Sequence, residues 1–376
     1  MVFEIFKSSW VVKKKDLYWP SEKMKKKAWV KDKKIYEEAL KDPIKFWEGL
    51  AEQLFWFKKW EKAFEHEPPY FKWFLGGKIN ITSNIFEKNP NWEKIKNKPA
   101  LIWEPEPLEE KPRILTYEEL FKEVNKFANA LKKMGVKKGD CVGIYLPMIP
   151  EVIISMLACA RIGAVHTVVF SAFSPEALKV RLQMTGAKIL ITADGYYRRG
   201  KIVNLKENAD EGIKETEVKK VVVVKRIGNQ ISWNQGRDFW WHELVEKESE
   251  ECEAEIMDSE DLLFILYTSG STGKPKGCCH VCGGYTVQAY WTGKWIFDLK
   301  DEDIMWCVHP KSLIVTNPEI KEIRELKIGD KVLTHEGRFE RVEKIFIRNY
   351  EGELIKLYTL YSNRPVELTP NHKVLV

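Results

Sequence analysis

Apolar and polar segments alternate regularly through the middle of the chain. Short, nearly continuous apolar runs, which are typical of buried strands, alternate with segments whose apolar residues recur at helical spacing. The predicted strands are 141–146, 164–170, 188–192, 221–224 and 262–266, and the predicted helices are 150–162 and 175–185, the second capped by Ser174. This alternation predicts an α/β fold in which helices cover a parallel sheet.

A longer helix is predicted before the first of these strands. Thr116 and Glu119 have the spacing of a capping box, and the helix that follows should stop at Gly135. Its helical spacing predicts one buried face, made of Leu120, Val124, Phe127, Ala128 and Leu131.

The first 80 residues have a different pattern, rich in tryptophan, lysine and glutamate. Segments 35–40 and 43–60 have helical spacing, and the Pro68-Pro69 pair ends that run. We expect a small helical N-terminal cap over residues 1–80 that packs aromatic side chains onto a larger domain.

Composition bounds the class of protein. A chain of 376 residues has room for two or three domains, and its formal charge of +6 is mild for this length. Its lysine clusters lie among glutamates and tryptophans, so solvated faces are favoured over nucleic-acid binding. The start lacks a signal peptide, and the longest apolar stretch, 152–170, is interrupted by Arg161 and His166. Seven cysteines at irregular spacing indicate reduced thiols, so we expect a soluble, cytoplasmic protein without nucleic-acid or membrane partners.

One loop stands out as candidate chemistry. The strand 262–266 runs into Tyr267-Thr268-Ser269-Gly270-Ser271-Thr272-Gly273-Lys274-Pro275-Lys276-Gly277. Glycines permit close backbone approach to an oxyanion, while amides, hydroxyls and lysines supply donors and charge. An ordinary polar loop is the alternative on composition alone. The Walker A pattern does not fit this string.

The whole string resembles the phosphate loop of the adenylate-forming enzymes. Three further stretches are similar to the AMP-forming acetyl-CoA synthetases: 145–151, 156–166 and 173–178. The resemblance runs from about Phe46 to Trp306 and implies an adenylate-forming domain over 81–306, which uses ATP, CoA and Mg²⁺ on acetate or a similar short carboxylate. In that family the loop holds the β- and γ-phosphates of ATP, which implies this role for Thr268, Ser269, Gly270, Ser271, Thr272, Gly273, Lys274 and Lys276.

The same resemblance implies a CoA-nucleotide pocket. Its turn is 168–174, containing Phe170 and Ser171, where two family glycines are replaced. Arg198 and Lys201 fall on the family's basic positions and are cations suited to a phosphate. Without the resemblance, a solvated basic loop would be the favoured interpretation of these two cations. The Mg²⁺ ligands are not identifiable from the sequence.

Cysteine spacing raises a metal alternative that we disfavour. Cys279 and Cys282 form a CxxC pair around His280. A zinc site would need a second pair at similar spacing, and the chain offers none. Packing beneath the loop is the better account, and no metal ligand is predicted.

After Trp306 the pattern changes abruptly. Short alternating strands, such as 339–347 and 353–361, are separated by turns, which predicts an antiparallel all-β segment over 307–376. Cys307, the turn 329–332, and Thr369 with His372 resemble the first part of an intein, with a Hint-like fold. The resemblance implies that Cys307 attacks the Trp306 carbonyl, that His372 protonates the leaving nitrogen and that Thr369 holds the geometry. A core cysteine with a loop histidine, and a chimeric reading frame, are the alternatives.

On this interpretation both the adenylate-forming domain and the Hint-like segment are incomplete. We expect the N-terminal part of an intein-interrupted acetyl-CoA synthetase, with a separately encoded C-terminal half as a possible partner. A synthetase for propionate or another short acid is one alternative. Another is a chain whose only operative chemistry is self-processing.

The intein hypothesis predicts a thiol-dependent cut. If Cys307 exchanges its amide for a thioester, added dithiothreitol or hydroxylamine should release residues 1–306, slowly without thiol and faster with it. Cys307→Ala should abolish the cleavage, and His372→Ala should slow it strongly while the fold stays intact. Intact mass locates the cut, and a thiol-dependent cut anywhere other than after Trp306 would contradict the hypothesis.

Overall fold

The computed structural model describes four stretches in full, residues 22–107, 110–198, 200–268 and 275–305. Outside them it gives the backbone of eight short strands: β1 (Val11–Lys14), β2 (Leu17–Pro20), β18 (Leu313–Val315), β19 (Ile320–Glu322), β20 (Lys331–Leu333), β21 (Phe339–Arg341), β22 (Ile355–Leu357) and β23 (Val366–Leu368). The chain divides into two units. One comprises Met1–Ile35, Glu106–Glu110 and Thr292–Val376, and the other Tyr36–Pro105 and Lys111–Trp291.

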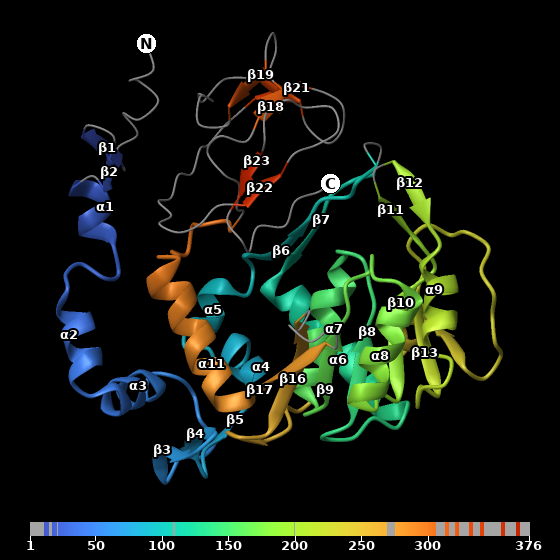
Figure 1. Cartoon of the computed structure of the whole chain (residues 1–376), viewed down its shortest axis with the longest axis horizontal. Coiled ribbons are helices and arrows are strands. Elements are labelled where there is room, and N and C mark those ends of the chain that lie inside the picture. Colours follow the sequence, from blue (N-terminus) through green and yellow to red (C-terminus); the bar gives the residue numbers. More distant parts are fainter. Residues whose placement is uncertain are drawn as a thin grey trace. The chain divides into compact units, whose positions relative to one another are not determined.

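The second unit is built on a seven-stranded sheet with the order β14-β13-β10-β8-β9-β16-β17 (Figure 1). All neighbours run parallel except β16 and β17, which are antiparallel. The strands are β8 (Cys141–Ile144), β9 (Val165–Val168), β10 (Ile189–Ala193), β13 (Lys220–Val224), β14 (Asp238–Trp240), β16 (Leu262–Thr268) and β17 (Lys276–Val281). The predicted parallel sheet is therefore confirmed.

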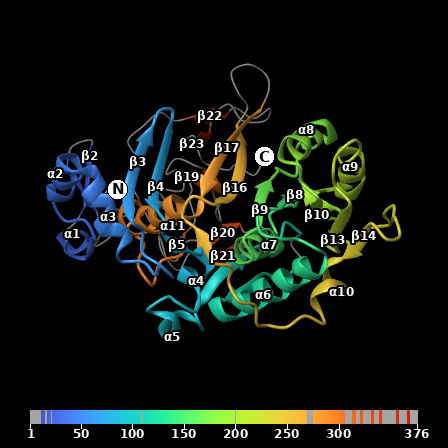
Figure 2. The ribbon, with the colours of Figure 1, turned by 90° about the horizontal axis from the view of Figure 1, so that it is seen from below.

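Helices cover both faces of this sheet, as Figure 2 shows. On one face lie α6 (Tyr117–Lys133), α7 (Pro150–Arg161) and α10 (Trp241–Val245), and on the other α8 (Pro175–Thr185) and α9 (Leu205–Gly212). Helix α8 has the predicted bounds, and the Ser174 side chain caps it by accepting a hydrogen bond from the amide of Ala177. Helix α6 has the predicted capping box between Thr116 and Glu119, and all five residues predicted for its inner face are buried.

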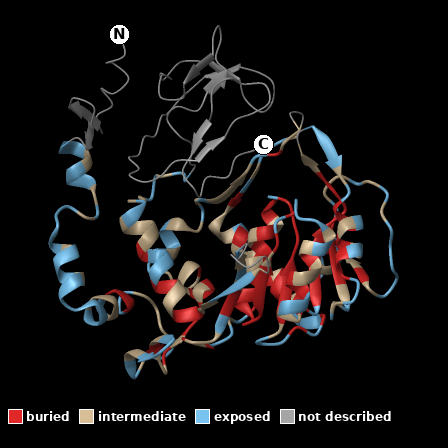
Figure 3. Ribbon diagram, viewed as in Figure 1, coloured by how far each residue is buried: buried red, intermediate tan, exposed pale blue. Residues whose placement is uncertain are grey.

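The core lies between the sheet and these helices. Buried residues concentrate in the parallel strands and in the helix faces turned towards them (Figure 3). Phe127 of α6 stacks on Trp241 of α10 with ring centroids 3.6 Å apart, which ties the two helices together. Full burial of a side chain of this size stabilises the fold by about 2–3 kcal/mol, so this face contributes strongly to stability.

A buried ionic network holds β14, the outermost strand on one side of the sheet, in place. The Lys206 side chain of α9 is fully buried, and its ammonium contacts Asp210 at 2.7 Å and Asp238 of β14 at 3.0 Å. Burial alone would raise the pKa of Asp238, but hydrogen bonds from Arg237, from the Asn234 amide and from Lys206 outweigh it and lower that pKa. Removing one partner would leave a buried charge uncompensated, so the network holds β14 to α9.

Two segments differ from the sequence-based expectation. Residues 62–75 were expected in a helical cap, but they form an antiparallel hairpin of β3 (Lys62–Glu67) and β4 (Tyr70–Leu75). Rings pair across it, Phe64 with Trp73 and His66 with Phe71, at 4.7 and 4.4 Å between centroids. Such cross-strand pairs stabilise a two-stranded sheet in a region that was expected to belong to the helical cap. Strand β16 is also less buried than predicted, since Leu262 and Leu266 near the sheet edge are exposed.

Within the part of the chain that the structure describes, three helices precede this hairpin, and the last two lie in the segments predicted to be helical, 35–40 and 43–60, although the last ends at Ala51 and not at residue 60. They are α1 (Glu22–Lys27), α2 (Lys34–Lys41) and α3 (Pro43–Ala51). The remaining elements of the described chain are β5 (Lys78–Ile79), α4 (Ile81–Ile85), α5 (Trp92–Ile95), β6 (Pro99–Trp103), β7 (Arg113–Thr116), β11 (Tyr196–Arg198), β12 (Lys201–Val203), β15 (Met257–Asp258), α11 (Cys282–Trp291) and the π-helical turn Thr292–Ile296. Among the described residues, no helix is long and apolar enough to cross a membrane.

In the first unit, the late strands pair as β18–β19, β20–β21 and β22–β23, all antiparallel. The all-β segment expected after Trp306 stays a prediction, because most of its residues lie outside the described ones. The domain limits at residues 80 and 306 stay predictions.

A buried histidine generates a pH prediction. His166 of β9 is 4% exposed, and neither of its ring nitrogens has a hydrogen-bond partner within the described stretches. Desolvation lowers its pKa to about 4, whereas an unfolded histidine titrates near 6.5. Between these two values the unfolded chain binds more protons than the folded chain. The contribution of His166 to the free energy of unfolding is therefore fully present above about pH 6.5 and is lost as the pH falls towards 4.

We therefore expect the free energy of unfolding to fall by about 2 kcal/mol between pH 7 and pH 5 through this group. Denaturant unfolding at both pH values measures it. His166→Phe should remove most of the slope, while His242→Phe, at an exposed histidine, should leave it unchanged. Equal slopes for the wild type and His166→Phe would contradict the prediction.

Candidate functional site

The carboxyl ends of the parallel strands bring the predicted site residues to one edge of the sheet. Strands β9 and β16 are neighbours, and Phe264 lies opposite His166 in their ladder. Because parallel strands end at the same edge, the turn after β9 and the loop after β16 emerge side by side. This edge is where ligands bind in open α/β sheets.

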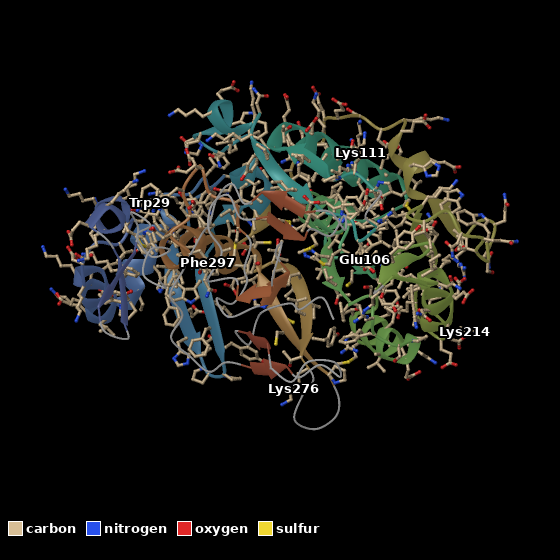
Figure 4. All side chains as sticks on the ribbon, turned by 90° about the horizontal axis from the view of Figure 1, so that it is seen from above. Trp29, Glu106, Lys111, Lys214, Lys276 and Phe297 are labelled. Atoms are coloured by element: carbon tan, nitrogen blue, oxygen red, sulfur yellow. The ribbon has the colours of Figure 1, made fainter. Side chains whose placement is uncertain are left out.

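The phosphate-loop residues lie on a hairpin connection. Thr268 ends β16, Lys276 begins β17, and the two are cross-strand partners. Both side chains are exposed, and Lys276 is labelled in Figure 4. Ser269, Gly270, Ser271, Thr272, Gly273 and Lys274 lie outside the described residues.

Three of the four residues predicted for CoA come together in the structure. Arg198 of β11 and Lys201 of β12 are cross-strand partners, so their side chains share one face of this two-stranded ribbon. The Arg198 guanidinium lies over the ring of Phe170, 5.6 Å from its centroid, and Phe170 is 54% exposed. One cation thus lies over an exposed aromatic residue of the turn after β9, and the second cation is its cross-strand neighbour. The fourth residue, Ser171, is buried.

Two tyrosines hold this turn, and neither was predicted from the sequence. Tyr145 donates a hydrogen bond of 2.7 Å to the Phe173 carbonyl, and Tyr196 donates one of 3.4 Å to the Ser171 carbonyl. Burial raises the pKa of Tyr145 to about 12, so it stays a neutral donor. Tyr196 directly follows Asp194 and Gly195, but Tyr145 lies inside the predicted strand 141–146, so its position in the sequence did not indicate this role.

Arg181, which was not predicted from the sequence, lies between the turn after β9 and the strand that enters the phosphate loop. The Arg181 guanidinium of α8 lies 4.7 Å from the ring centroid of Phe173 and 5.7 Å from that of Tyr267. It also donates a hydrogen bond to the Ala177 carbonyl. Desolvation lowers the pKa of Arg181, and burial raises that of Tyr267. The arginine therefore connects the turn after β9 with the strand that enters the phosphate loop.

A buried carboxylate organises the neighbouring loops. Asp194, fully buried at the end of β10, accepts hydrogen bonds from four backbone amides, those of Gly195, Arg226, Ile227 and Gly228, at 2.7–3.3 Å. The first amide begins the path into β11, and the other three belong to the loop after β13. One side chain thus fixes two loops at the carboxyl edge.

The cysteines near the loop do not form a metal cluster in the described structure. Cys278 and Cys279 are exposed on β17, whereas Cys282 is buried and its pKa is raised to about 12 by desolvation. The His280 ring stacks on Phe264 at 4.4 Å, in line with the packing role expected from the sequence. Within the described stretches, no three histidine, cysteine or acidic side chains could hold a metal ion together. Cys307, Thr369 and His372 lie outside the described residues.

Two family models match the chain. The AMP-binding enzyme family matches residues 88–317, and the acetyl-coenzyme A synthetase N-terminus family matches residues 32–85. The first match extends past the boundary predicted at Trp306–Cys307, and that boundary stays a prediction.

Curated relatives and a solved structure agree with these matches. The acetyl-coenzyme A synthetase of Rubrobacter xylanophilus is 51% identical over 292 residues, which cover 77% of this chain and 45% of that protein. The acetyl-coenzyme A synthetase of Methanothrix soehngenii is 49% identical over 289 residues, covering 76% and 43%. The acetoacetyl-CoA synthetase of Streptomyces lividans superposes with a TM-score of 0.65 at 25% identity, covering 71% of this chain and 41% of that one. The chain spans less than half the length of these relatives.

The role of Asp194 can be tested by Asp194→Asn. This change replaces a charged carboxylate, whose two oxygens both accept hydrogen bonds, with a neutral amide, which has one accepting oxygen and one donating NH2 group. Hydrogen bonds to a charged group are the stronger ones, so we expect the free energy of unfolding to fall by about 2–3 kcal/mol, measured by denaturant titration. Glu207→Gln makes the same chemical change at an exposed carboxylate and should cost close to nothing. Equal stability of the two variants would show that the amide contacts do not hold the loops.

Proposed function

The chain belongs to the AMP-binding enzyme family, and on that basis we propose that it is the N-terminal portion of an AMP-forming acetate–CoA ligase. Such an enzyme joins acetate to ATP with release of pyrophosphate, then exchanges AMP for CoA to give acetyl-CoA. The observation that carries the proposal is that two elements suited to anions follow neighbouring strands: the glycine- and lysine-containing loop comes after β16, and the contact of Arg198 with Phe170 lies after β9. A reaction that uses ATP first and CoA second needs both.

In the first step, a carboxylate oxygen of acetate attacks the α-phosphorus of ATP and pyrophosphate leaves. The leaving group gains negative charge, which the residues of the phosphate loop are suited to stabilise. We assign Lys274 and Lys276 to charge neutralisation, and the hydroxyls of Thr268, Ser269, Ser271 and Thr272 to hydrogen bonds with the phosphate oxygens. Gly270 and Gly273 would permit the backbone to approach them.

Magnesium would neutralise further phosphate charge when it is bound with ATP. Its protein ligands cannot be named from the described residues, because no cluster of three candidate side chains lies among them. A divalent ion held by one or two carboxylates and the phosphates themselves would not need such a cluster. We therefore assign no residue of this chain to it.

In the second step, the thiol sulfur of CoA attacks the acetyl carbonyl and AMP leaves. The nucleotide end of CoA carries phosphates and an adenine ring. We assign Arg198 and Lys201 to the phosphates and the exposed ring of Phe170 to stacking with adenine. The backbone at Ser171, held by Tyr196, would fix the turn on which Phe170 lies.

Acetate is the proposed substrate because the relatives named above are acetyl-coenzyme A synthetases. A ligase for propionate or another short acid is the alternative within the same reaction. Substrate competition in an enzyme completed with the remaining part of the Rubrobacter xylanophilus relative would separate the two.

We further propose that residues 307–376 are the first part of an intein that interrupts this ligase. The residue set Cys307, Thr369 and His372 motivates this proposal, and the antiparallel pairing of the short late strands supports it. A separately encoded C-terminal half is the partner that this proposal implies. The thiol-dependent cut after Trp306 is its test, and its failure would leave the ligase proposal untouched.

The division between ATP and CoA residues predicts separable defects. Gly270→Val or Gly273→Val should block the backbone approach to phosphate and weaken ATP binding at least tenfold. Arg198→Ala or Lys201→Ala should weaken CoA binding and leave acetate-dependent ATP–pyrophosphate exchange nearly intact in the completed enzyme. Calorimetric titration measures binding, and isotope exchange measures adenylation.

Lys214→Ala is the matched control, because Lys214 is an exposed lysine close to the end of α9 (labelled in Figure 4) and should change neither affinity. If the glycine and the cation variants impaired adenylation equally, the division between the two sites would be wrong.

A further inference from the structure

Arg226 lies between two aromatic rings at the edge of the sheet that carries the candidate site. Its guanidinium is 4.9 Å from the ring centroid of Trp103 and 5.5 Å from that of Tyr197. The three residues come from β6, from the loop after β13 and from β11, which are distant in sequence. A guanidinium is planar and weakly hydrated, so it stacks on aromatic rings better than an ammonium does.

Two contacts fix this arrangement from outside the ribbon of β11 and β12. The Trp103 indole donates a hydrogen bond of 2.8 Å to the Met148 carbonyl, in the turn after β8. The backbone amide of Arg226 donates one of 2.8 Å to the buried Asp194 carboxylate. Arg226 and Trp103 are therefore both anchored to the sheet, and Tyr197 is the member of the three that belongs to the ribbon.

The ribbon itself is too small to hold its own shape. Strands β11 and β12 have three residues each and, among the strands that the structure describes, pair only with one another. A two-stranded ribbon is at best marginally stable in water without packing against another element. Tyr197 and Ile202 share one face of it, and Arg198 and Lys201, the next pair along, share the opposite face. Arg226 thus contacts the face opposite to the one that carries the two proposed CoA cations.

We propose that Arg226 is a positioning residue for the CoA-nucleotide site, holding the β11–β12 ribbon so that Arg198 and Lys201 stay beside Phe170. The proposal rests on the proposed function for the identity of the ligand. Arg226 acts through Tyr197 and does not touch CoA. Its loss should therefore affect CoA and leave the phosphate loop after β16 unaffected.

The first experiment is calorimetric titration of the full chain with CoA and, separately, with ATP. Arg226→Ala should weaken CoA binding about tenfold, a size expected from loss of two cation–π contacts, while the affinity for ATP stays within twofold. Arg226→Lys keeps the charge but not the stacking plane, so its CoA affinity should lie between those of Arg226→Ala and the wild type. Arg198→Ala serves as the reference for direct loss of a CoA contact.

The second experiment measures, without any ligand, how firmly the β11–β12 ribbon is held, from the rate of proteolysis within it. A lysine-specific protease cuts after Lys201, which is exposed on β12, and the Arg226→Ala change neither adds nor removes a lysine. Arg226→Ala should speed this cut at least fivefold under native conditions, while the melting temperature and the cut after Lys214 stay unchanged. Arg226→Lys is left out of this experiment, because it would add a cleavage site for the protease.

The outcomes separate the two proposals. If Arg198→Ala weakens CoA binding but Arg226→Ala changes neither binding nor cleavage, the positioning role is wrong and the proposed function stands. If the wild type does not bind CoA, the proposed function fails, and unchanged cleavage after Lys201 would then overturn the positioning role as well. Loss of ATP binding together with a lower melting temperature in both Arg226 variants would mean a global structural role and would also overturn it.

Discussion

The loops at the carboxyl-terminal ends of the parallel strands depend on one buried anion, the side chain of Asp194. A charge removed from water is costly unless its hydrogen bonds are replaced, and here four backbone amides replace them. Because amides rather than a lysine or arginine satisfy this anion, its negative charge fixes backbone geometry. The loop after β13 and the start of the β11–β12 ribbon are held at one point. Apart from Phe170, every side chain proposed to contact the CoA nucleotide lies on that ribbon.

Aromatic rings provide the second organising interaction at this edge. Arg181 lies against Phe173 and Tyr267, and Arg198 lies over Phe170. A ring orients a guanidinium without neutralising it, whereas a carboxylate partner would cancel its charge. The positive potential of these arginines thus stays available to phosphate groups arriving at the edge. This arrangement suits an enzyme whose substrates are polyanions.

The parts of the fold that could be predicted are those with local causes. Ser174 and Pro175 mark the start of α8, and the Thr116–Glu119 box marks that of α6, because capping is decided by neighbours in sequence. Strand β17 was missed because four of its six residues are exposed and give no apolar pattern. The β3–β4 hairpin was missed because its ring pairs lie across a turn.

At the site, the loop and the cations could be identified by their types and spacing. Tyr145, Arg181 and Arg226 could not, since their roles arise from contacts between residues distant along the chain.

The pairing of Thr268 with Lys276 bears on the entropy of nucleotide capture. A segment of seven residues, 269–275, has both ends held in one antiparallel ladder. Bringing the two ends of a chain segment together costs conformational entropy, and here the β16–β17 ladder meets that cost when the chain folds. On the proposed function, binding of a triphosphate does not meet that part of the cost. If the chain binds nucleotide as proposed, the affinity depends on how firmly the edge strand β17 is paired, and any change that loosens β17 would weaken ATP binding from a distance.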